Sequence, residues 1–299
     1  MKWKGRDIMY TDMFGKKCVK VGLHHHTTVS DGKKSPNEVA ALYRDAGYDA
    51  IAITDHWKYG NPQELEGLFI LPGAEYNVGA NDTLNGVYHI LCLFADSEPQ
   101  VEKEMPAQKI IDAIHAVNGL AVLAHPAWSL NTPEMIRSLN GIDATEIFNT
   151  VSDRGHSRRA DSSLIVDMLA VHGTVFPLLA SDDSHYYGEG NLADATTAFI
   201  MAECDSVDDT VLKKAITEKR FYASTGPEIH LTRDGDTFTV HCSPAQEIVF
   251  MTSAAWAPRV TTGENLTTAT YTICPFDTFV RAYVTDKNGK RAWTNIVEI

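Results

Sequence analysis

Short apolar runs alternate with helical patterns along the chain up to about residue 225. The runs have the length and composition of buried strands, and they occupy residues 50–53, 68–71, 88–94, 120–124, 144–148 and 175–180. Between them, apolar residues recur at helical spacing over residues 101–118, 133–139, 157–171 and 206–219. This alternation predicts an α/β architecture with a mostly parallel sheet.

One helix has a clear start signal. Ser35-Pro36-Asn37-Glu38 is a capping box with proline at the first helical position. Val39, Leu42 and Tyr43 follow at helical spacing. We therefore predict a helix that begins after Ser35 and ends near Gly47.

The pattern changes near Thr225-Gly226-Pro227, after which no convincing helical pattern occurs. Residues 228–233 and 236–242 alternate on either side of Asp234-Gly235, and residues 279–285 and 290–299 flank Asn288-Gly289. Both dipeptides are hairpin signals. Residues 246–252 and 268–274 are further strand candidates. We predict two domains, residues 1–225 and residues 226–299, the second being small, antiparallel and sandwich-like.

Composition is that of a globular protein of 299 residues, with 44% hydrophobic and 22% charged residues. No apolar stretch approaches the roughly 18 residues of a membrane span, and the N-terminus lacks the apolar segment of a signal peptide. The five cysteines are scattered and form no Cys-x-x-Cys pair. This usage disfavours disulfides and thiolate zinc sites, and it predicts a cytoplasmic protein.

The formal net charge of −13 disfavours long duplex nucleic acid and anionic membranes as partners. It leaves small phosphorylated substrates open, because bound divalent cations reverse the sign of a site locally.

Three consecutive histidines form the densest chemical signal. His24, His25 and His26 follow an apolar-leaning run. If that run is a strand, its period of two directs His24 and His26 to one side and His25 to the other. Two imidazoles on one face can share a metal ion, and Asp31 follows on a turn. A tag or a surface polyhistidine patch is the alternative, which the short internal tract disfavours.

Other predicted strands also end in residues that bind metals. These are His56 in Thr54-Asp55-His56, Glu75 after Pro72-Gly73-Ala74, His89 within an apolar run, His125 before Pro126, and Asp183 with His185. Imidazole with carboxylate suits zinc, manganese or iron. The lack of cysteine ligands favours a catalytic site over a structural one. Because barrel strands end at a common mouth, we expect these side chains to converge there.

These motifs resemble those of the PHP (polymerase and histidinol phosphatase) domain family. His24-His25-His26-Thr27 with Ser30-Asp31-Gly32 matches its first motif, Thr54-Asp55-His56 the second, Gly73-Ala74-Glu75 the third, and Ser181-Asp182-Asp183-Ser184-His185 the last. His89 and Ala124-His125-Pro126 match its remaining ligand positions. The match runs in order from about residue 19 to residue 225. It implies a distorted (β/α)7, TIM-like barrel with two or three metal ions. The β domain resembles the appendage of some stand-alone members more loosely.

Carried over by position, the resemblance implies nine metal ligands. The first metal ion would take His24, His26, Glu75 and Asp183; the second, Glu75, His89 and His125; the third, Asp31, His56 and His185. All nine positions hold a residue type that the family uses. The resemblance thus implies a metal-dependent phosphoesterase that hydrolyses a phosphate mono- or diester with metal-activated water.

Four further residues are candidates for catalysis. Asp55 and Asp182 neighbour predicted ligands and are candidates for orienting them or for acid–base work; for Asp182 the alternative is a solvated loop acid. Arg158 and Arg159 follow the strand at residues 144–148, so we predict that one of them contacts the substrate phosphate. The alternative for these two is a pair of arginines on a helix surface.

Three functions remain open. The leading hypothesis is a phosphoesterase acting on a small phosphorylated substrate, such as a nucleotide or a short oligonucleotide. The second is a metal-dependent amidohydrolase, since barrels with histidine-rich mouths also cleave C–N bonds. The third is a binding module, in which the β domain holds a partner and the barrel is vestigial.

Overall fold

The computed structural model describes residues 10–79, 86–153, 157–187 and 193–299. The helices are α1 (Pro36–Asp45), α2 (Ala107–Ala116), α3 (Pro133–Arg137), α4 (Ser163–Val171) and α5 (Asp209–Thr217). The strands are β1 (Tyr10–Thr11), β2 (Lys17–Gly22), β3 (Ala50–Ala52), β4 (Gln63–Leu65), β5 (Leu68–Leu71), β6 (Gly73–Val78), β7 (Tyr88–Leu93), β8 (Leu120–Leu123), β9 (Ala144–Asn149), β10 (Leu178–Ser181), β11 (Phe199–Glu203), β12 (Phe221–Ser224), β13 (Ile229–Asp234), β14 (Thr237–Thr252), β15 (Val260–Thr272), β16 (Phe279–Thr285), β17 (Arg291–Trp293) and β18 (Val297–Glu298). None of these helices is long and apolar enough to cross a membrane.

The capping box opens α1 as predicted. The Ser35 side chain accepts a hydrogen bond from the backbone N–H of Glu38, and the Glu38 side chain accepts one from the backbone N–H of Ser35. These bonds satisfy donors that the first helical turn leaves without partners. The helix buries Val39, Ala40 and Tyr43, so its predicted start and buried face are both confirmed.

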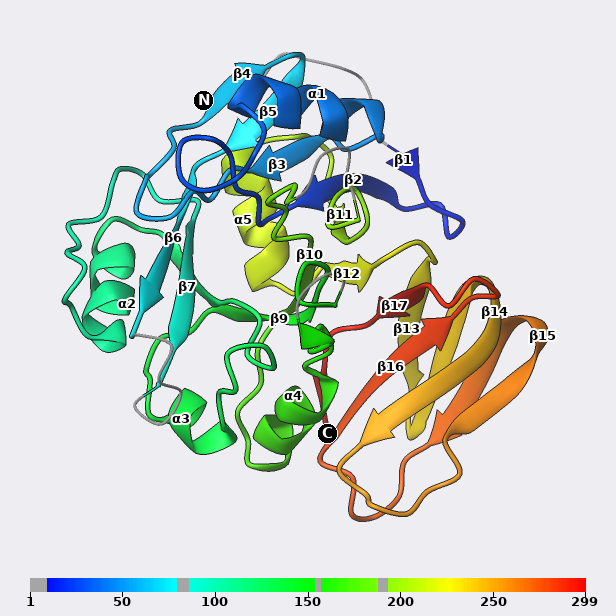
Figure 1. Ribbon diagram of the computed structural model, residues 1–299. Coiled ribbons are helices and arrows are strands. Elements are labelled where there is room, and N and C mark those ends of the chain that lie inside the picture. The colour runs from blue at the N-terminus through cyan, green and yellow to red at the C-terminus, as the bar shows by residue number, and fades with distance from the viewer. Residues whose placement is uncertain (1–9, 80–85, 154–156, 188–192) are drawn as a thin grey trace.

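The described strands form two sheets. One runs in the order β10-β9-β8-β7-β6, and the other contains β12-β11-β2-β3-β5-β4 and continues into the C-terminal strands (Figure 1). The pairs β2–β3, β3–β5, β8–β9 and β9–β10 are parallel. The pairs β6–β7, β7–β8, β2–β11 and β11–β12 are antiparallel. The predicted α/β class is confirmed, but the predicted mostly parallel pairing is wrong. The nine residues between β6 and β7 are fewer than the dozen or more that a parallel crossover connection needs, so this pair is antiparallel.

The five-stranded sheet approaches the larger sheet at both of its own edges, β10 and β6. Isolated parallel bridges join His25 to Ser184, beyond the ends of β2 and β10, and His56 to Glu75, between the end of β3 and β6. The backbone N–H of Asp183 also donates to the carbonyl of His24 at 2.9 Å. No continuous ladder closes the described strands into a barrel. The bridges nevertheless bring strand ends from both sheets to one place.

A buried core fills the space between the sheets. It includes Val21 and Leu23 near β2, Leu91 from β7, Val122 from β8 and Leu179 from β10. Because side chains from both sheets meet in one apolar cluster, the interior is packed rather than hollow. That packing holds the strand ends in place.

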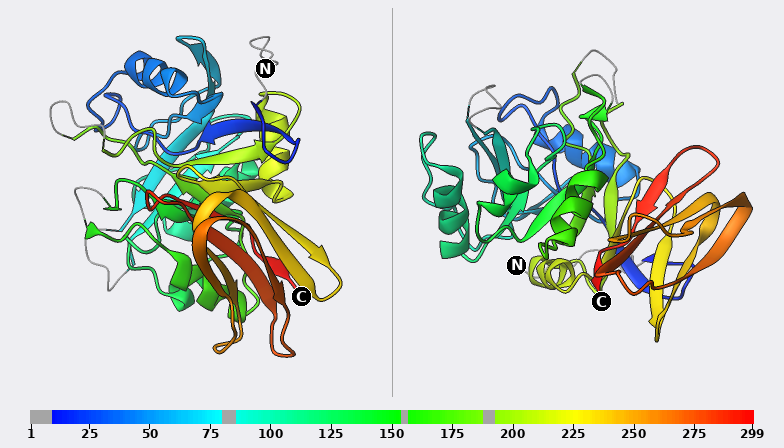
Figure 2. Two further views of the ribbon diagram at one scale, coloured as in Figure 1. Left: turned by 90° about the vertical axis from the view of Figure 1, so that its right-hand side faces the viewer. Right: turned by 90° about the horizontal axis from the view of Figure 1, so that it is seen from below.

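The C-terminal strands pack on one side of the larger unit (Figure 2). All of their pairings are antiparallel. Because β17 pairs with β12, strands from before and after residue 225 belong to one continuous sheet. A single long strand, β14, covers both of the stretches predicted near residues 236–242 and 246–252. Arg281 of β16 forms a buried two-bond ion pair with Asp167 of α4. The C-terminal strands are therefore joined to the rest of the chain by a ladder and an ion pair.

Candidate metal centre

The structure brings all nine predicted metal ligands together. They come from the ends of strands in both sheets: His24 and His26 follow β2, His56 follows β3, Glu75 lies in β6, His89 lies in β7, His125 follows β8, and Asp183 and His185 follow β10, while Asp31 lies in the loop after His26. Their ligand atoms fall into three groups whose members lie within 4.8 Å of one another. Two of these groups contain the residues that were predicted for them. The third contains His26 in addition to its predicted residues.

The first group is buried and compact. It comprises His24, His26, Glu75 and Asp183. The Nε2 atoms of His24 and His26 lie 3.2 and 3.0 Å from Glu75 Oε2, and 3.3 and 3.2 Å from Asp183 Oδ1. As the period of two predicts, His25 turns to the other side, where its ring packs edge-on against Tyr43.

The second group shares Glu75 with the first. Its other carboxylate oxygen, Oε1, lies 2.8 Å from His89 Nδ1 and 3.5 Å from His125 Nε2. Glu75 thus presents one oxygen to each group. This is the arrangement expected of a carboxylate that bridges two cations.

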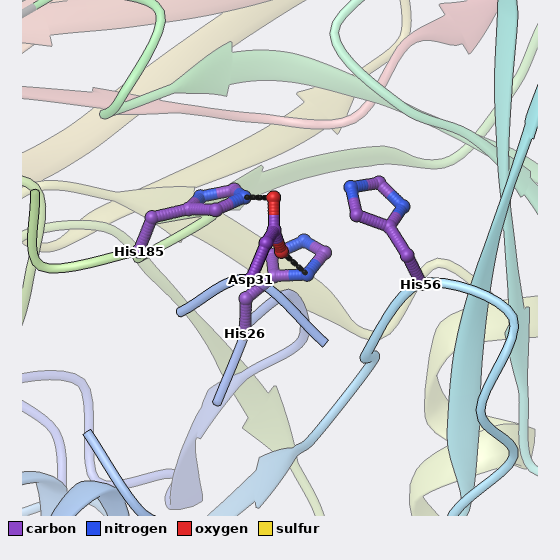
Figure 3. A group of neighbouring side chains, drawn as sticks. All are labelled: His26, Asp31, His56 and His185. Carbon is purple, nitrogen blue, oxygen red and sulfur yellow. Dashed lines mark ion pairs between the residues drawn. The ribbon is translucent and has the colours of Figure 1, made fainter. Parts of the chain in front are cut away.

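The third group lies nearest to solvent and is drawn in Figure 3. Asp31 Oδ1 lies 3.6 Å from His26 Nδ1, and Asp31 Oδ2 lies 3.6 Å from His185 Nε2. His56 completes the group. The Asp31 side chain is 44% exposed, whereas those of His24 and His26 are fully buried. His26 belongs to both the first and the third groups, which the sequence did not predict.

These groups fit divalent cations. Ligand atoms about 2.1 Å from a tetrahedral cation stand roughly 3.4 Å apart, close to the spacings in the first group. Buried polar atoms in the cluster also lack hydrogen-bond partners among the described residues, namely His26 Nδ1, His56 Nδ1 and Asp183 Oδ1. Such atoms are costly unless something else satisfies them. A cation in the first group and another in the third would do so.

Electrostatics in the cluster strongly favour positive charge. Burial disfavours a charged imidazole, but the carboxylates of Asp183 and Glu75 outweigh it and raise the pKa of His26 to about 9. The pKa values of His24 and His125 are raised in the same way. Burial likewise opposes ionisation of Glu75, yet the surrounding histidines hold its pKa well below the usual range. The acids thus stay ionised and attract any available cation.

Glu146 of β9 is a fully buried acid that sequence reasoning missed. Its Oε1 lies 2.8 Å from His24 Nδ1, and its Oε2 accepts from the backbone N–H of His125 at 2.8 Å and from Asn149 Nδ2 at 2.8 Å. Because a carboxylate only accepts, His24 donates from Nδ1, and its Nε2 is the ring nitrogen that faces the first group. The available signal was an acid inside the apolar run at residues 144–148.

Two of the predicted ligands have strained backbones. His125 and Asp183 have φ values of 29° and 53°, which are uncommon for residues other than glycine. Such conformations persist only where the surroundings enforce them, and they cluster at functional sites. Here, hydrogen bonds from the N–H of His125 to Glu146 and from the N–H of Asp183 to His24 hold them.

Among the described residues, Asp55 and Asp182 form hydrogen bonds with groups next to the proposed ligands rather than with the ligand side chains. Asp55 accepts from the backbone and hydroxyl of Thr27 and from the Ser30 hydroxyl, which shapes the loop that carries Asp31. Asp182 accepts from the hydroxyls of Tyr43 and Thr150 and from backbone N–H groups at residues 197 and 198. Burial raises its pKa to about 6 despite these bonds. Whether these two acids orient the ligands or take part in acid–base work stays a prediction.

The two predicted arginines lie away from the cluster. Arg158 is 78% exposed and its guanidinium lies 3.4 Å from Asp153. It lines a separate cleft of about 530 Å³, together with Lys290 and Arg291 from the β16–β17 hairpin. Arg159 is exposed as well. The structure does not bring either guanidinium to the metal groups, so their contact with substrate stays a prediction.

The cluster opens into a pocket of about 180 Å³. Besides proposed ligands, its wall contains Trp128, Val151, Ser152 and Tyr187. Trp128 packs edge-on against His89 and His125, and Tyr187 stacks on His185 and donates to Asp31 Oδ2. No lysine or arginine is among the described residues that line it.

Comparison with solved structures shows which known folds the chain resembles. Over 100% of this chain and 99% of the other, the structure resembles a two-domain protein from Bacteroides vulgatus ATCC 8482 that contains a predicted PHP-like metal-dependent phosphoesterase. The TM-score is 0.52 and the sequence identity is 16%. The resemblance to the PHP fold inferred from the motifs is thus confirmed at the level of structure.

Two further structures match about two thirds of this chain. A candidate metal-dependent phosphoesterase from Bifidobacterium adolescentis ATCC 15703 is 14% identical and matches 66% of this chain and 94% of its own, with a TM-score of 0.44. An amidohydrolase from Chromobacterium violaceum, with bound sulfate and no metal, is 16% identical and matches 67% and 96%, with a TM-score of 0.45. No family model and no curated protein matches the chain.

Proposed function

We propose that this protein is a metal-dependent phosphoesterase that hydrolyses a phosphate mono- or diester. The observation that carries the proposal is the set of three histidine–carboxylate groups in which Glu75 offers one oxygen to each of two groups. Nothing in the stability of the fold calls for six histidines and three acids at one mouth. Such a cluster is costly unless cations occupy it.

The residues of the chain have distinct roles in this proposal. His24, His26, Glu75 and Asp183 would hold one cation. Glu75, His89 and His125 would hold a second, and Asp31, His56 and His185, with His26, a third. Divalent cations bound there neutralise the ester oxygens and lower the pKa of water. Glu146 orients His24, while Asp55 and Asp182 hold the loops that carry Asp31 and Asp183. Zinc, manganese and iron suit this ligand set.

We also propose that the strands bearing these residues belong to a distorted (β/α)7 barrel. Seven strands, namely β2, β3, β6, β7, β8, β9 and β10, each end in or carry a proposed ligand or, for β9, its partner Glu146. In barrels, residues at such strand ends carry the chemistry, whereas the opposite face serves stability. Residues 1–225 would then form the catalytic domain and residues 226–299 an appended β domain.

The proposed substrate is small. The pocket of about 180 Å³ admits a phosphate ester rather than a long duplex, and the net charge of −13 repels polyanions. A nucleotide or a short oligonucleotide end fits both conditions.

Metal reconstitution tests the proposal. The metal-free protein is loaded with manganese, zinc or iron and assayed on a panel of phosphate monoesters, phosphate diesters and amides. We expect phosphate ester hydrolysis that requires metal and falls at least 100-fold in Glu75→Gln, because that change removes the charge shared by two groups. The matched control is Glu264→Gln on the exposed strand β15, which should leave turnover unchanged. Amide cleavage without phosphate ester cleavage would establish the amidohydrolase alternative instead.

A further inference from the structure

A second cleft lies where the larger unit and the C-terminal strands meet. Its volume is about 530 Å³, against about 180 Å³ for the metal pocket, and the two share none of their described lining residues. The stacked rings of Phe148 in β9 and Trp293 in β17, with centroids 5.4 Å apart, join its two sides. The charged residues that line it are Asp153, Arg158, Asp161, Lys290 and Arg291.

The cleft is positively charged in a chain whose formal net charge is −13. Three of its lining side chains are cationic and two are carboxylates, which leaves the lining with a net positive charge. A concave surface with a net positive charge attracts anions and repels cations. The cleft therefore differs in sign from the rest of the chain, and it favours an anionic ligand.

Two of the cations form ion pairs that solvent reaches. Arg158 Nη1 lies 3.4 Å from Asp153 Oδ1, and Arg291 Nη1 lies 2.9 Å from Asp161 Oδ2. All four side chains are 36% exposed or more. Ion pairs in such positions contribute little to stability. Either guanidinium can therefore turn from its acid to a bound anion at small cost.

Lys290 is the cation that these acids leave unpaired. Its ammonium forms no ion pair within the described part of the chain. Its alkyl stem packs on Gly226, where an added Cβ would lie 2.7 Å from Lys290 Cδ, and its backbone N–H donates to Asp286 Oδ1 at 2.8 Å. Stem and backbone thus hold an uncompensated charge at the cleft.

The wall of the cleft also contains a residue with a strained backbone. Thr196 has a φ of 53°, which is an outlier for a β-branched residue. Its backbone N–H donates to the hydroxyl of the buried Tyr43 at 3.2 Å, and this bond helps to hold the conformation. Strained residues of this kind cluster at ligand sites and other functional sites.

We propose that this cleft is a second ligand site, which binds a small organic oxyanion that carries two negative charges. Lys290, Arg158 and Arg291 bind the oxyanion, and Thr196 supplies a hydroxyl at the wall. Phosphate and carboxylate share this chemistry, because a guanidinium binds either through two N–H groups. In this role Arg158 serves the second cleft rather than the metal pocket. Because Lys290 and Arg291 belong to the β16–β17 hairpin, the C-terminal strands supply part of the site.

Titration calorimetry on the metal-free full-length protein tests the site. The probes are glycerol 2-phosphate and succinate, which carry the two kinds of oxyanion, with glycerol as the uncharged control. Ionic strength is kept constant because salt screens exposed charges. We expect a dianion to bind and its affinity to fall about 10-fold in Lys290→Met, which removes a charged hydrogen-bond donor. The matched control is Lys287→Met, in the same hairpin but outside the cleft lining, which should keep wild-type affinity. The dianion that binds more tightly identifies the ligand as phosphorylated or carboxylic.

Thermal unfolding provides a second readout, because a ligand that binds only the folded state raises the Tm. The tighter-binding probe should raise the Tm of wild type and of Lys287→Met, and raise it less in Lys290→Met and Arg158→Met. Absence of binding by both dianions would overturn the site. So would equal affinities in wild type and Lys290→Met, which would place the anion elsewhere. Neither measurement involves turnover, so failure of the proposed hydrolysis would leave this result unchanged.

Discussion

His24 can serve a cation through Nε2 only if a partner holds its other ring nitrogen. Glu146 is that partner, and it also accepts from the backbone of His125 and from Asn149. One buried acid therefore contacts residues of two groups, through the side chain of His24 and the backbone of His125. Burial opposes the ionisation of Glu146, but the charges of His24 and His125 keep its pKa below the usual range. Residues of this kind determine how well a metal site is organised beyond its direct ligands.

Replacing Glu146 with glutamine should weaken metal binding while preserving the fold. The amide keeps the size of the side chain but loses the charge that fixes the His24 tautomer. We expect metal affinity to fall by roughly 10- to 100-fold. Competition with a chelator measures this, with Glu134→Gln on the surface of α3 as control. Unchanged affinity would show that Glu146 does not orient His24.

Metal binding should depend steeply on pH. In the metal-free protein the pKa of His26 is about 9, and those of His24 and His125 are also raised, so cations must displace protons at neutral pH. A histidine with a raised pKa stabilises the fold at low pH, and this contribution is lost as pH rises from about 6.5 through 9. The metal-free Tm should therefore fall over that interval, while the increase in Tm caused by added manganese grows. Thermal unfolding at fixed manganese between pH 6 and 9 checks this; a constant increase would contradict it.

At the scale of elements, the sequence predicted the features that short local motifs specify. It missed strands whose pairing joins distant segments of the chain. The capping box placed the start of α1, and Asp234-Gly235 and Asn288-Gly289 marked the β13–β14 and β16–β17 turns. The antiparallel strands β11 and β12 were not predicted. They are short, and their pairing with β2 and β17 joins segments far apart in sequence.

The ion pair between α4 and β16 should matter for stability. Arg281 is fully buried, and its Nε and Nη2 lie 2.7 and 2.8 Å from the carboxylate of Asp167. Asp167→Ala would leave a buried guanidinium without its partner, at a cost of about 3–5 kcal/mol in the free energy of unfolding. Urea denaturation measures it. Asp112→Ala, which breaks an exposed pair with Lys109, should have a much smaller effect on the free energy of unfolding. Equal effects would mean that the buried pair does not join the two elements.

At the scale of the molecule, the larger unit and the C-terminal strands share one core. A single apolar cluster contains Tyr43 and Ile51 from the N-terminal part and Phe238, Ile248 and Val284 from the C-terminal part. The sheet also continues from β12 to β17. The predicted division at residue 225 therefore crosses both a ladder and a core.

This continuity predicts joint unfolding. Calorimetry of the metal-free protein should show one cooperative transition, because separating the two parts exposes buried apolar surface on both. A chain cut after Thr225 should be far less soluble than the whole chain for the same reason. Two well-separated transitions, or a soluble and folded 1–225 fragment, would show that the parts are independent.

The sequence alone determined the α/β class, the start of α1, the antiparallel C-terminal region and the identity of the residues that converge at the mouth. Those features depend on local patterns: periodicity, capping and the residues at strand ends. Tertiary structure decided the rest. It directed the two oxygens of Glu75 to two different groups and placed Glu146 beside His24. It also added His26 to the third group and placed Arg158 in another cleft. It also made the sheet mixed and continuous across residue 225. These outcomes depend on contacts between segments distant in the chain, which local patterns do not encode.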